Sequence, residues 1–353
     1  NLGKCIDRLV SLGVNTVFIQ GFCDVEGTGN VSSVYFANSV LPVKMDFLNH
    51  AVNRIKAREI SVYAWMPALS FILPNQEQND RLLVREFRHG QIGKTTDSYK
   101  RLSPFDSRSL EISRRIFRDL SANVNFDGVL FQDDAFLTDH EDFHPSAAAV
   151  FQKAVGTELT PAAVKNDAIK TQWIQLKTKT LNNYLNELIQ TIHIYRPTAK
   201  IARNIYSEAV TNPDSQEWFA QNLGAYLRDY DYTVIMAYPQ MEKIGGLWTK
   251  IGGMWKIKKW MQELVDRVNS YHGLNKTVFK VQAFNWGTDA WIDAETLKNE
   301  LIYLLSLGVR NVAYYPDGVI ENQPPVKAIA PIISGREFSR DSVTSISPQL
   351  MTK

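Results

Sequence analysis

Two adjacent carboxylates, Asp133 and Asp134, follow an apolar segment that begins at Phe126. A continuous apolar run of this kind is typical of a strand buried on both faces of a parallel sheet. Parallel α/β folds place their chemistry at the carboxyl ends of such strands, where two aspartates are costly to desolvate. The pair therefore indicates a functional site. The alternative is that Asp134 caps the next helix and Asp133 is solvated.

The ends of the other apolar segments carry a mixture of aromatic, amide and charged side chains. Aromatic faces stack on sugar rings, whereas amides and carboxylates bind hydroxyl or amine groups. If all these ends meet at one rim, the mixture predicts a carbohydrate site. The candidates for substrate binding are Asp24, Trp65, Arg101, Asp106, Arg203, Asn204, Tyr238, Asn285, Trp286, Tyr315 and Asp317.

Glycoside cleavage is the reaction that this set favours, because it commonly uses two carboxyl groups across the scissile bond. One donates a proton to the leaving oxygen, and the other acts as base or nucleophile or positions an N-acetyl group of the substrate. Asp133 or Asp134 together with Glu242, from a different strand end, can supply the pair. Side chains alternate along a strand, so we expect Asp133 and Asp134 to point apart. Inversion, retention and substrate assistance all stay open.

Seven apolar segments alternate with helical patterns and must position these residues. This order predicts parallel strands joined by crossover helices, and hence a (β/α)8 TIM-barrel-like α/β fold. An eighth strand is not evident, which allows an irregular or incomplete barrel. A doubly wound sheet is the second choice, but no GxGxxG or P-loop pattern follows any segment. The predicted strands are 15–23, 60–70, 127–131, 200–205, 232–237, 277–284 and 311–315. The predicted helices are 2–12, 45–58, 109–122, 167–195, 214–228, 255–271 and 294–307.

Composition narrows the function further. The 353 residues carry 39 basic and 37 acidic side chains, a net charge of +2, which gives no basic field for nucleic acid. The six histidines show no HxH spacing, and we expect no metal site. We predict one domain over 1–335 and a peripheral tail over 336–353. The chain opens at Asn1 and enters a helix almost at once, so we expect it to be part of a longer precursor.

Several motifs across nearly the whole chain resemble one family. The chain is similar to the C-terminal domain of the PgaB, BpsB and HmsF family of poly-β-1,6-N-acetylglucosamine deacetylases. One departure is Gln132, where some relatives are expected to have His. The motifs that carry the resemblance are NLGK at 1–4, YAWMP at 63–67, RLSPFD at 101–106, FDG at 126–128, DDA at 133–135, ARNI at 202–205, EWFAQN at 217–222, QAFNW at 282–286 and YYPD at 314–317.

The resemblance implies a barrel-like glycoside hydrolase domain that binds and cleaves partially de-N-acetylated poly-N-acetylglucosamine, without a cofactor in this domain. It implies Asp133, Asp134 and Glu242 as catalytic candidates, with Trp286 beside them. It also implies a missing N-terminal deacetylase domain, a periplasmic, outer-membrane-associated setting, and outer-membrane export machinery as a partner in biofilm formation. Two other functions stay open: a non-catalytic polysaccharide-binding module, and a carboxylate-dependent metal hydrolase.

Overall fold

The computed structural model describes residues 2–244 and 253–335. Seven parallel strands form its central sheet, and they occur in the sheet in the order in which they occur in the chain. Doubly wound sheets reverse strand order at a switch point, so this sequential order rejects the second choice. The strands are β1 (Thr16–Gln20), β4 (Ser61–Met66), β7 (Gly128–Phe131), β8 (Lys200–Tyr206), β9 (Tyr232–Ala237), β10 (Thr277–Gln282) and β13 (Asn311–Tyr315).

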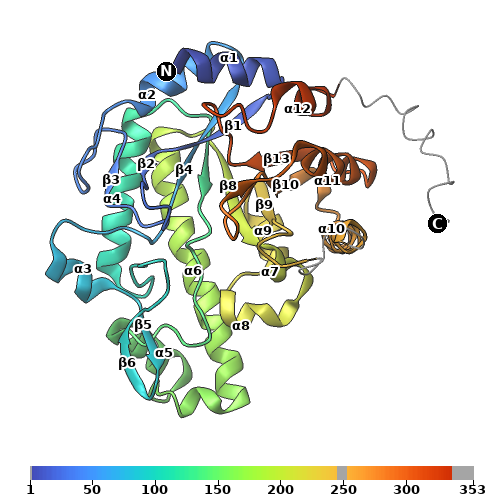
Figure 1. Cartoon of the computed structure of the whole chain (residues 1–353). Helices are drawn as coiled ribbons and strands as arrows, with labels where there is room; N and C mark the ends of the chain where they lie inside the picture. The colour runs from blue at the N-terminus through green and yellow to red at the C-terminus, as the bar shows by residue number, and fades with distance from the viewer. Residues whose placement is uncertain (1, 245–252, 336–353) are drawn as a thin grey trace.

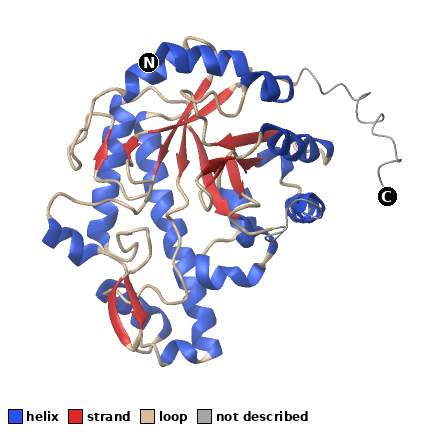
Figure 2. Ribbon diagram, viewed as in Figure 1, coloured by secondary structure: helices blue, strands red, loops and turns tan. Residues whose placement is uncertain are grey.

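The sheet is curled into an incomplete barrel, as the sequence predicted. Among the described residues β1 pairs only with β4 and β13 only with β10, so the two outer strands remain edges. Helices surround the curled sheet (Figures 1 and 2). They are α1 (Leu2–Leu12), α2 (Leu48–Lys56), α3 (Gln76–Leu82), α4 (Ser107–Asn123), α5 (Pro145–Val155), α6 (Asp167–Tyr195), α7 (Ser207–Thr211), α8 (Gln216–Phe219), α9 (Leu223–Asp229), α10 (Gly253–Asn269), α11 (Ala294–Ser306) and α12 (Val326–Ile333).

Short elements extend from this frame at the strand ends. Three small antiparallel ribbons pair β2 with β3, β5 with β6, and β11 with β12. Their strands are β2 (Phe22–Cys23), β3 (Ser33–Val34), β5 (Arg85–Arg88), β6 (Gln91–Lys94), β11 (Phe284–Asn285) and β12 (Ala290–Trp291). Three 3-10 turns complete the set: η1 (Ala163–Lys165), η2 (Pro213–Ser215) and η3 (Leu274–Lys276).

The gap between the edge strands is closed by side chains rather than by a strand pair. Helices α1 and α12 pack against each other at this edge, and they lie side by side in Figure 1. The buried guanidinium of Arg8, on α1, donates to both Asp317 oxygens at 2.8–3.0 Å and to the Asn322 side chain at 2.7 Å. It also donates to the Pro324 carbonyl at 2.8 Å. An ion pair therefore links the first helix to the loop after the last strand.

Several predicted segments are wrong in their limits, and the strand predicted over 277–284 ends at Gln282 because Phe284 pairs with β12. The helix predicted over 214–228 is two helices, because Ala220 takes a left-handed conformation (φ 50°) and Asn222 caps α9. The strand predicted over 15–23 ends at Gln20, since Phe22–Cys23 turns away to pair with β3. The strand predicted over 60–70 ends at Met66, and the next backbone N–H groups bind Asp134 instead. The predicted tail over 336–353 lies outside the described residues.

Candidate active site

Asp133 lies just beyond the end of β7 and keeps part of its surface exposed. Two tyrosine hydroxyls donate to its Oδ2 atom: Tyr99 at 3.2 Å and Tyr206 at 3.1 Å. Tyr99 comes from the connection that follows β6, and Tyr206 is the last residue of β8. The carboxylate is therefore held in place from two sides and still faces solvent.

Asp134 occupies the opposite environment and is completely buried. Its carboxylate accepts backbone N–H groups of Ala68 (3.0 and 3.1 Å), Leu69 (2.6 Å) and Ser70 (2.7 Å), which follow β4. Burial raises the pKa of Asp134, while these three N–H groups act in the opposite direction. The adjacent aspartates do point apart: one faces outward, and the other fastens the end of β7 to the turn after β4.

Glu242 lies in the turn after β9, where it is exposed. The Ser207 hydroxyl donates to its Oε1 at 2.5 Å. Ser207 directly follows Tyr206, which binds Asp133, so two consecutive residues contact two carboxylates from different strand ends. The structure therefore brings Asp133 and Glu242 to the same rim, on either side of the end of β8.

Four aromatic residues named from the sequence gather at this rim. Trp286 is 43% exposed and stacks on Tyr315, with ring centroids 6.0 Å apart at an interplanar angle of 28°. Tyr238 lies 5.7 Å from the Trp286 ring, and Trp65 makes an edge contact with Tyr315 at 4.9 Å. These rings come from β4, β13, the loop after β9 and the turn between β11 and β12. We call Trp65, Tyr238, Trp286 and Tyr315 the aromatic floor.

The aromatic floor lies within electrostatic reach of Asp133. Burial raises the pKa of Tyr238 well above its usual value, and the Asp133 charge acts in the same direction. Burial also raises the pKa of Tyr315, to which Asp133 and Asp24 both contribute. Asp24 itself accepts the backbone N–H groups of Thr28 (3.0 Å) and Gly29 (2.8 Å). Asp24 thus shapes a turn beside the same rim.

Three residues predicted to bind substrate are instead buried in structural networks. Arg101 is fully buried, pairs with Glu141 at 2.9 Å and lies over the Phe136 ring. Arg203 is fully buried and donates to the Tyr230 hydroxyl at 2.9 Å. Asp106 is 4% exposed and caps α4. These side chains have no surface to offer a sugar, so we correct their predicted role to structural support.

The remaining three candidates differ in their exposure and in how far other side chains already occupy them. Asn204 is fully buried on β8, where its Nδ2 donates to the Phe131 carbonyl at 2.9 Å. Asp317 is engaged by Arg8 and by the Tyr314 hydroxyl at 2.7 Å. Asn285 is partly exposed, and its side chain accepts the Gly287 N–H at 2.9 Å. Of the three, only Asn285 combines exposure with a position next to Trp286.

Four residues beside the site were not among the candidates chosen from the sequence: Tyr99, Tyr206, Ser207 and Lys280. Lys280 had a detectable signal, because it is a charged residue in the middle of the apolar strand β10. Its buried Nζ donates to Asn204 Oδ1 at 2.7 Å. The sequence gives no such indication for Tyr99, because this residue lies 34 positions before Asp133 in a connecting segment.

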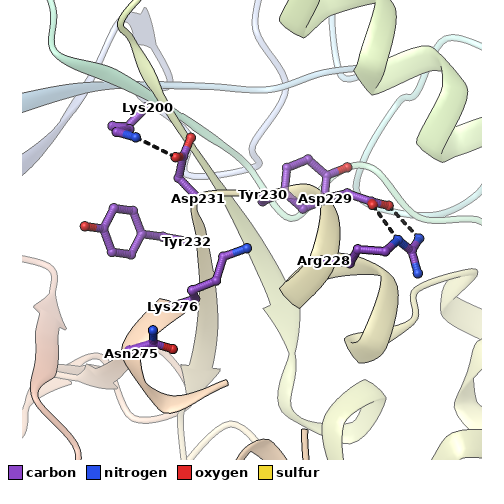
Figure 3. Close-up of a pocket in the computed structure, with 8 residues that line it drawn as sticks. All are labelled: Lys200, Arg228, Asp229, Tyr230, Asp231, Tyr232, Asn275 and Lys276. Carbon is purple, nitrogen blue, oxygen red and sulfur yellow. Dashed lines mark hydrogen bonds and ion pairs between the residues drawn. The ribbon is translucent and has the colours of Figure 1, made fainter. Parts of the chain in front are cut away.

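A separate hollow lies at the opposite, amino-terminal ends of β8, β9 and β10 (Figure 3). Four of its five charged side chains form two ion pairs: Lys200 with Asp231 at 2.9 Å, and Arg228 with Asp229 at 2.7 Å. It contains none of the predicted site residues. The residues that line it are Lys200, Arg228, Asp229, Tyr230, Asp231, Tyr232, Asn275 and Lys276.

The described part of the chain contains neither a metal-binding cluster nor a membrane-spanning helix. Within residues 2–244 and 253–335, no group of three or more His, Cys, Asp or Glu side chains is arranged to hold a metal ion. No helix in the same ranges is both long and apolar enough to cross a membrane. The cysteines Cys5 and Cys23 are unpaired thiols in the structure.

Comparison with known proteins shows the family of the chain. The family model described as "Hypothetical glycosyl hydrolase family 13" matches residues 1–315. The poly-β-1,6-N-acetyl-D-glucosamine N-deacetylase of Escherichia coli K12 is 34% identical over 340 residues, which are 95% of this chain and 49% of that protein. The chain thus spans about half the length of the curated relatives it matches.

Solved structures place the chain within the same group. The glycoside hydrolase domain of PgaB (BpsB) from Bordetella bronchiseptica is 33% identical, with a TM-score of 0.85 over 94% of this chain and 92% of that one. A β-galactosidase from Halorubrum lacusprofundi is 11% identical, with a TM-score of 0.67 over 98% of this chain and 56% of that one, and shows similarity of fold alone. This chain therefore belongs to hypothetical glycosyl hydrolase family 13, together with the PgaB-type glycoside hydrolase domains.

Proposed function

We propose that this domain is an endo-acting glycosidase that cleaves partially de-N-acetylated poly-β-1,6-N-acetyl-D-glucosamine. The observation that carries the proposal is the placement of Asp133 and Glu242. They come from different strand ends, both are at least partly exposed, and both are bound by the consecutive residues Tyr206 and Ser207. Glycoside cleavage typically uses two carboxyl groups that flank the scissile bond.

Asp133 is the carboxyl group that we assign to proton exchange with the glycosidic oxygen. It is the accessible member of the aspartate pair, and the hydroxyls of Tyr99 and Tyr206 fix its Oδ2 atom. We assign Glu242 as the second carboxyl, which acts on the attacking water, the sugar or its acetamido group. Asp134 contacts no substrate in this assignment, because its buried carboxylate is taken up by backbone N–H groups. It positions Asp133 through the end of β7.

The substrate assignment rests on the relatives and on the aromatic floor. The Escherichia coli relative is named for poly-β-1,6-N-acetyl-D-glucosamine, and the Bordetella bronchiseptica domain is described as a glycoside hydrolase. The rings of Trp286 and Tyr315 come from separate strand ends and keep part of their surface exposed, so they can offer apolar faces to a sugar, while the buried Tyr238 packs against Trp286. Glucosamine units are cationic near neutral pH, and Asp133, Asp24 and Glu242 supply nearby negative charge.

The wider setting follows from the same relatives as part of the proposal. The domain would act beside an N-terminal deacetylase domain in a periplasmic, outer-membrane-associated protein. Its partner would be outer-membrane export machinery, and its role would be to shorten or hold the polymer during biofilm export. The domain itself uses no cofactor in this account.

The test is incubation of the protein with the partially de-N-acetylated polymer, followed by mass spectrometry of the products. We expect shorter oligosaccharides of several lengths, which mark internal cleavage, and about 100-fold or greater loss of rate in Glu242→Gln. Glu263→Gln, on α10, is the control for an acidic residue outside the site. Oligosaccharide binding without any new fragments would replace the enzyme with the non-catalytic binding module. Loss of cleavage after exhaustive chelation would point instead to the metal hydrolase.

A further inference from the structure

Lys280 is a buried cation at the centre of the curled sheet. It lies in β10, it is 2% exposed, and its Nζ lies 4.8 Å from the Trp65 ring centroid, 5.6 Å from Tyr238 and 5.7 Å from Tyr315. It thus sits against three of the four rings of the aromatic floor. A buried ammonium is costly unless hydrogen bonds or opposite charge compensate it.

Two groups compensate the Lys280 ammonium. The first is Asn204, whose Oδ1 accepts from Nζ at 2.7 Å and whose Nδ2 donates to the Phe131 carbonyl at 2.9 Å. Phe131 ends β7, two residues before Asp133. The second is the Asp133 charge. Burial lowers the pKa of Lys280 to about 8, and Asp133 acts in the opposite direction. Lys280 is therefore linked through Asn204 to the end of β7 by hydrogen bonds, and to Asp133 by charge.

We propose that Lys280 is a positioning residue for Asp133, and that its ammonium holds the end of β7 and the site's negative charge in the arrangement used for hydrolysis. The inference rests on the proposed function. The groups that face Nζ are Asp133 after β7, Asn204 on β8, Trp65 on β4, Tyr238 after β9 and Tyr315 on β13. Asp133 is the one carboxylate in this set.

The charge link can be tested without any hydrolysis. Lysine side chains labelled with 13C and 15N are titrated by NMR, and the Lys280 signal is assigned by its absence in Lys280→Met. Because Asp133 raises the pKa of Lys280, Asp133→Asn should move the Lys280 midpoint to lower pH. The matched control is Lys177, which is another buried lysine. Burial lowers the pKa of Lys177 to about 8, and the Asp139 charge acts in the opposite direction. Asp139→Asn should move the Lys177 midpoint and leave that of Lys280 in place.

The positioning role is tested by the pH profile of polymer cleavage. In the wild type the rate should fall as pH rises through about 8, where Lys280 loses its proton. Lys280→Met should lower kcat by about 10- to 100-fold, change KM by less than about threefold, and abolish the fall near pH 8. Lys280→Arg keeps the charge, so it should recover part of kcat and stay active to higher pH. In Lys177→Met the cleavage rate should still fall near pH 8, as it does in the wild type.

The possible results separate the two claims. An unchanged Lys280 midpoint in Asp133→Asn overturns the charge link, whatever the activity. A wild-type kcat and pH profile in Lys280→Met overturns the positioning role even if the link exists. A wild-type protein that cleaves nothing, while the NMR shifts appear as expected, contradicts the proposed glycosidase function rather than the pairing of Lys280 with Asp133.

Discussion

The hydroxyl of Tyr206 lies 3.1 Å from Oδ2 of Asp133, and it donates a hydrogen bond across the gap between the ends of β8 and β7. The ring of Tyr206 is itself fixed, because it stacks on Phe219 with centroids 4.4 Å apart. A rigid donor of this kind holds a carboxylate in one orientation without occupying its second oxygen. This contact explains how an aspartate on a loop can be both exposed and ordered.

Removal of this hydroxyl should affect the reaction more than the fold. In Tyr206→Phe the ring keeps its stack on Phe219, while Asp133 loses one of its two phenolic donors. We expect kcat/KM for polymer cleavage to fall about 10- to 100-fold, the cost of a hydrogen bond to a charged group. The midpoint of thermal unfolding should change by less than about 3 °C. Tyr195→Phe, an exposed tyrosine at the end of α6, is the control and should retain full activity.

Asp134 should matter for stability. In Asp134→Ala the backbone N–H groups of Ala68, Leu69 and Ser70 lose a buried acceptor. We expect the free energy of unfolding to fall by about 2–4 kcal/mol, as measured by urea denaturation. Asp133→Asn changes the neighbouring, partly exposed residue and should cost less than about 1 kcal/mol. Equal losses in the two variants would contradict the division of roles between these aspartates.

Trp286 should contribute to sugar binding without supporting the fold. It is 43% exposed and stacks on Tyr315 at the rim. In Trp286→Ala we expect the Kd for glucosamine-containing oligosaccharides to rise about 5- to 50-fold, since a stacked aromatic face is lost. Isothermal titration calorimetry measures this change. Trp255→Ala removes a tryptophan that is 67% exposed on α10, and it should bind like the wild type.

Glu300 should make the domain less stable as pH rises. Burial raises its pKa in the folded protein to about 8 from an ordinary value of 4.5. Between these values the folded state keeps a proton that the unfolded state has lost, so this group's contribution to stability falls as pH rises from about 4.5 to about 8. Glu300→Gln should therefore gain about 2–4 kcal/mol relative to the wild type between pH 5 and pH 8. Urea denaturation at both pH values measures the gain.

The control for Glu300 is on the same helix. Glu295, in the first turn of α11, is exposed. Glu295→Gln should leave the difference in stability between pH 5 and pH 8 as it is in the wild type. If Glu300→Gln and Glu295→Gln gave the same pH dependence as the wild type, burial of Glu300 would not be the cause.

The central sheet could be predicted from the sequence because its strands are short apolar runs with clear breaks. The limits of 232–237 and 311–315 match β9 and β13. Helix 214–228 was not divided in advance, because Ala220 is not a glycine and its left-handed conformation has no signal in the sequence. Arg8 and Asp317, which pair across the open edge of the sheet, are 309 positions apart in the chain. No local sequence pattern predicts this pair.

The candidate site was predicted in part for the same reason. Asp133, Glu242 and Trp286 could be identified from the sequence because they follow predicted strands, and the end of a strand is a local feature of the sequence. Whether a charged residue near a strand end faces solvent depends on distant partners. Arg101 is buried by Glu141, which lies 40 residues later in the chain. Lys280 shows the converse, because it lies inside a buried strand yet faces the aromatic floor.

The most direct test of the account compares wild-type protein with Asp133→Asn on the partially de-N-acetylated polymer, with products counted by mass spectrometry over time. Asp139→Asn, which changes an exposed aspartate six positions after Asp133 in the same loop region, is the control. We predict that the wild type and Asp139→Asn release oligosaccharides at similar rates, while Asp133→Asn is at least about 100-fold slower and still binds the polymer. Cleavage by Asp133→Asn at the wild-type rate would contradict the account.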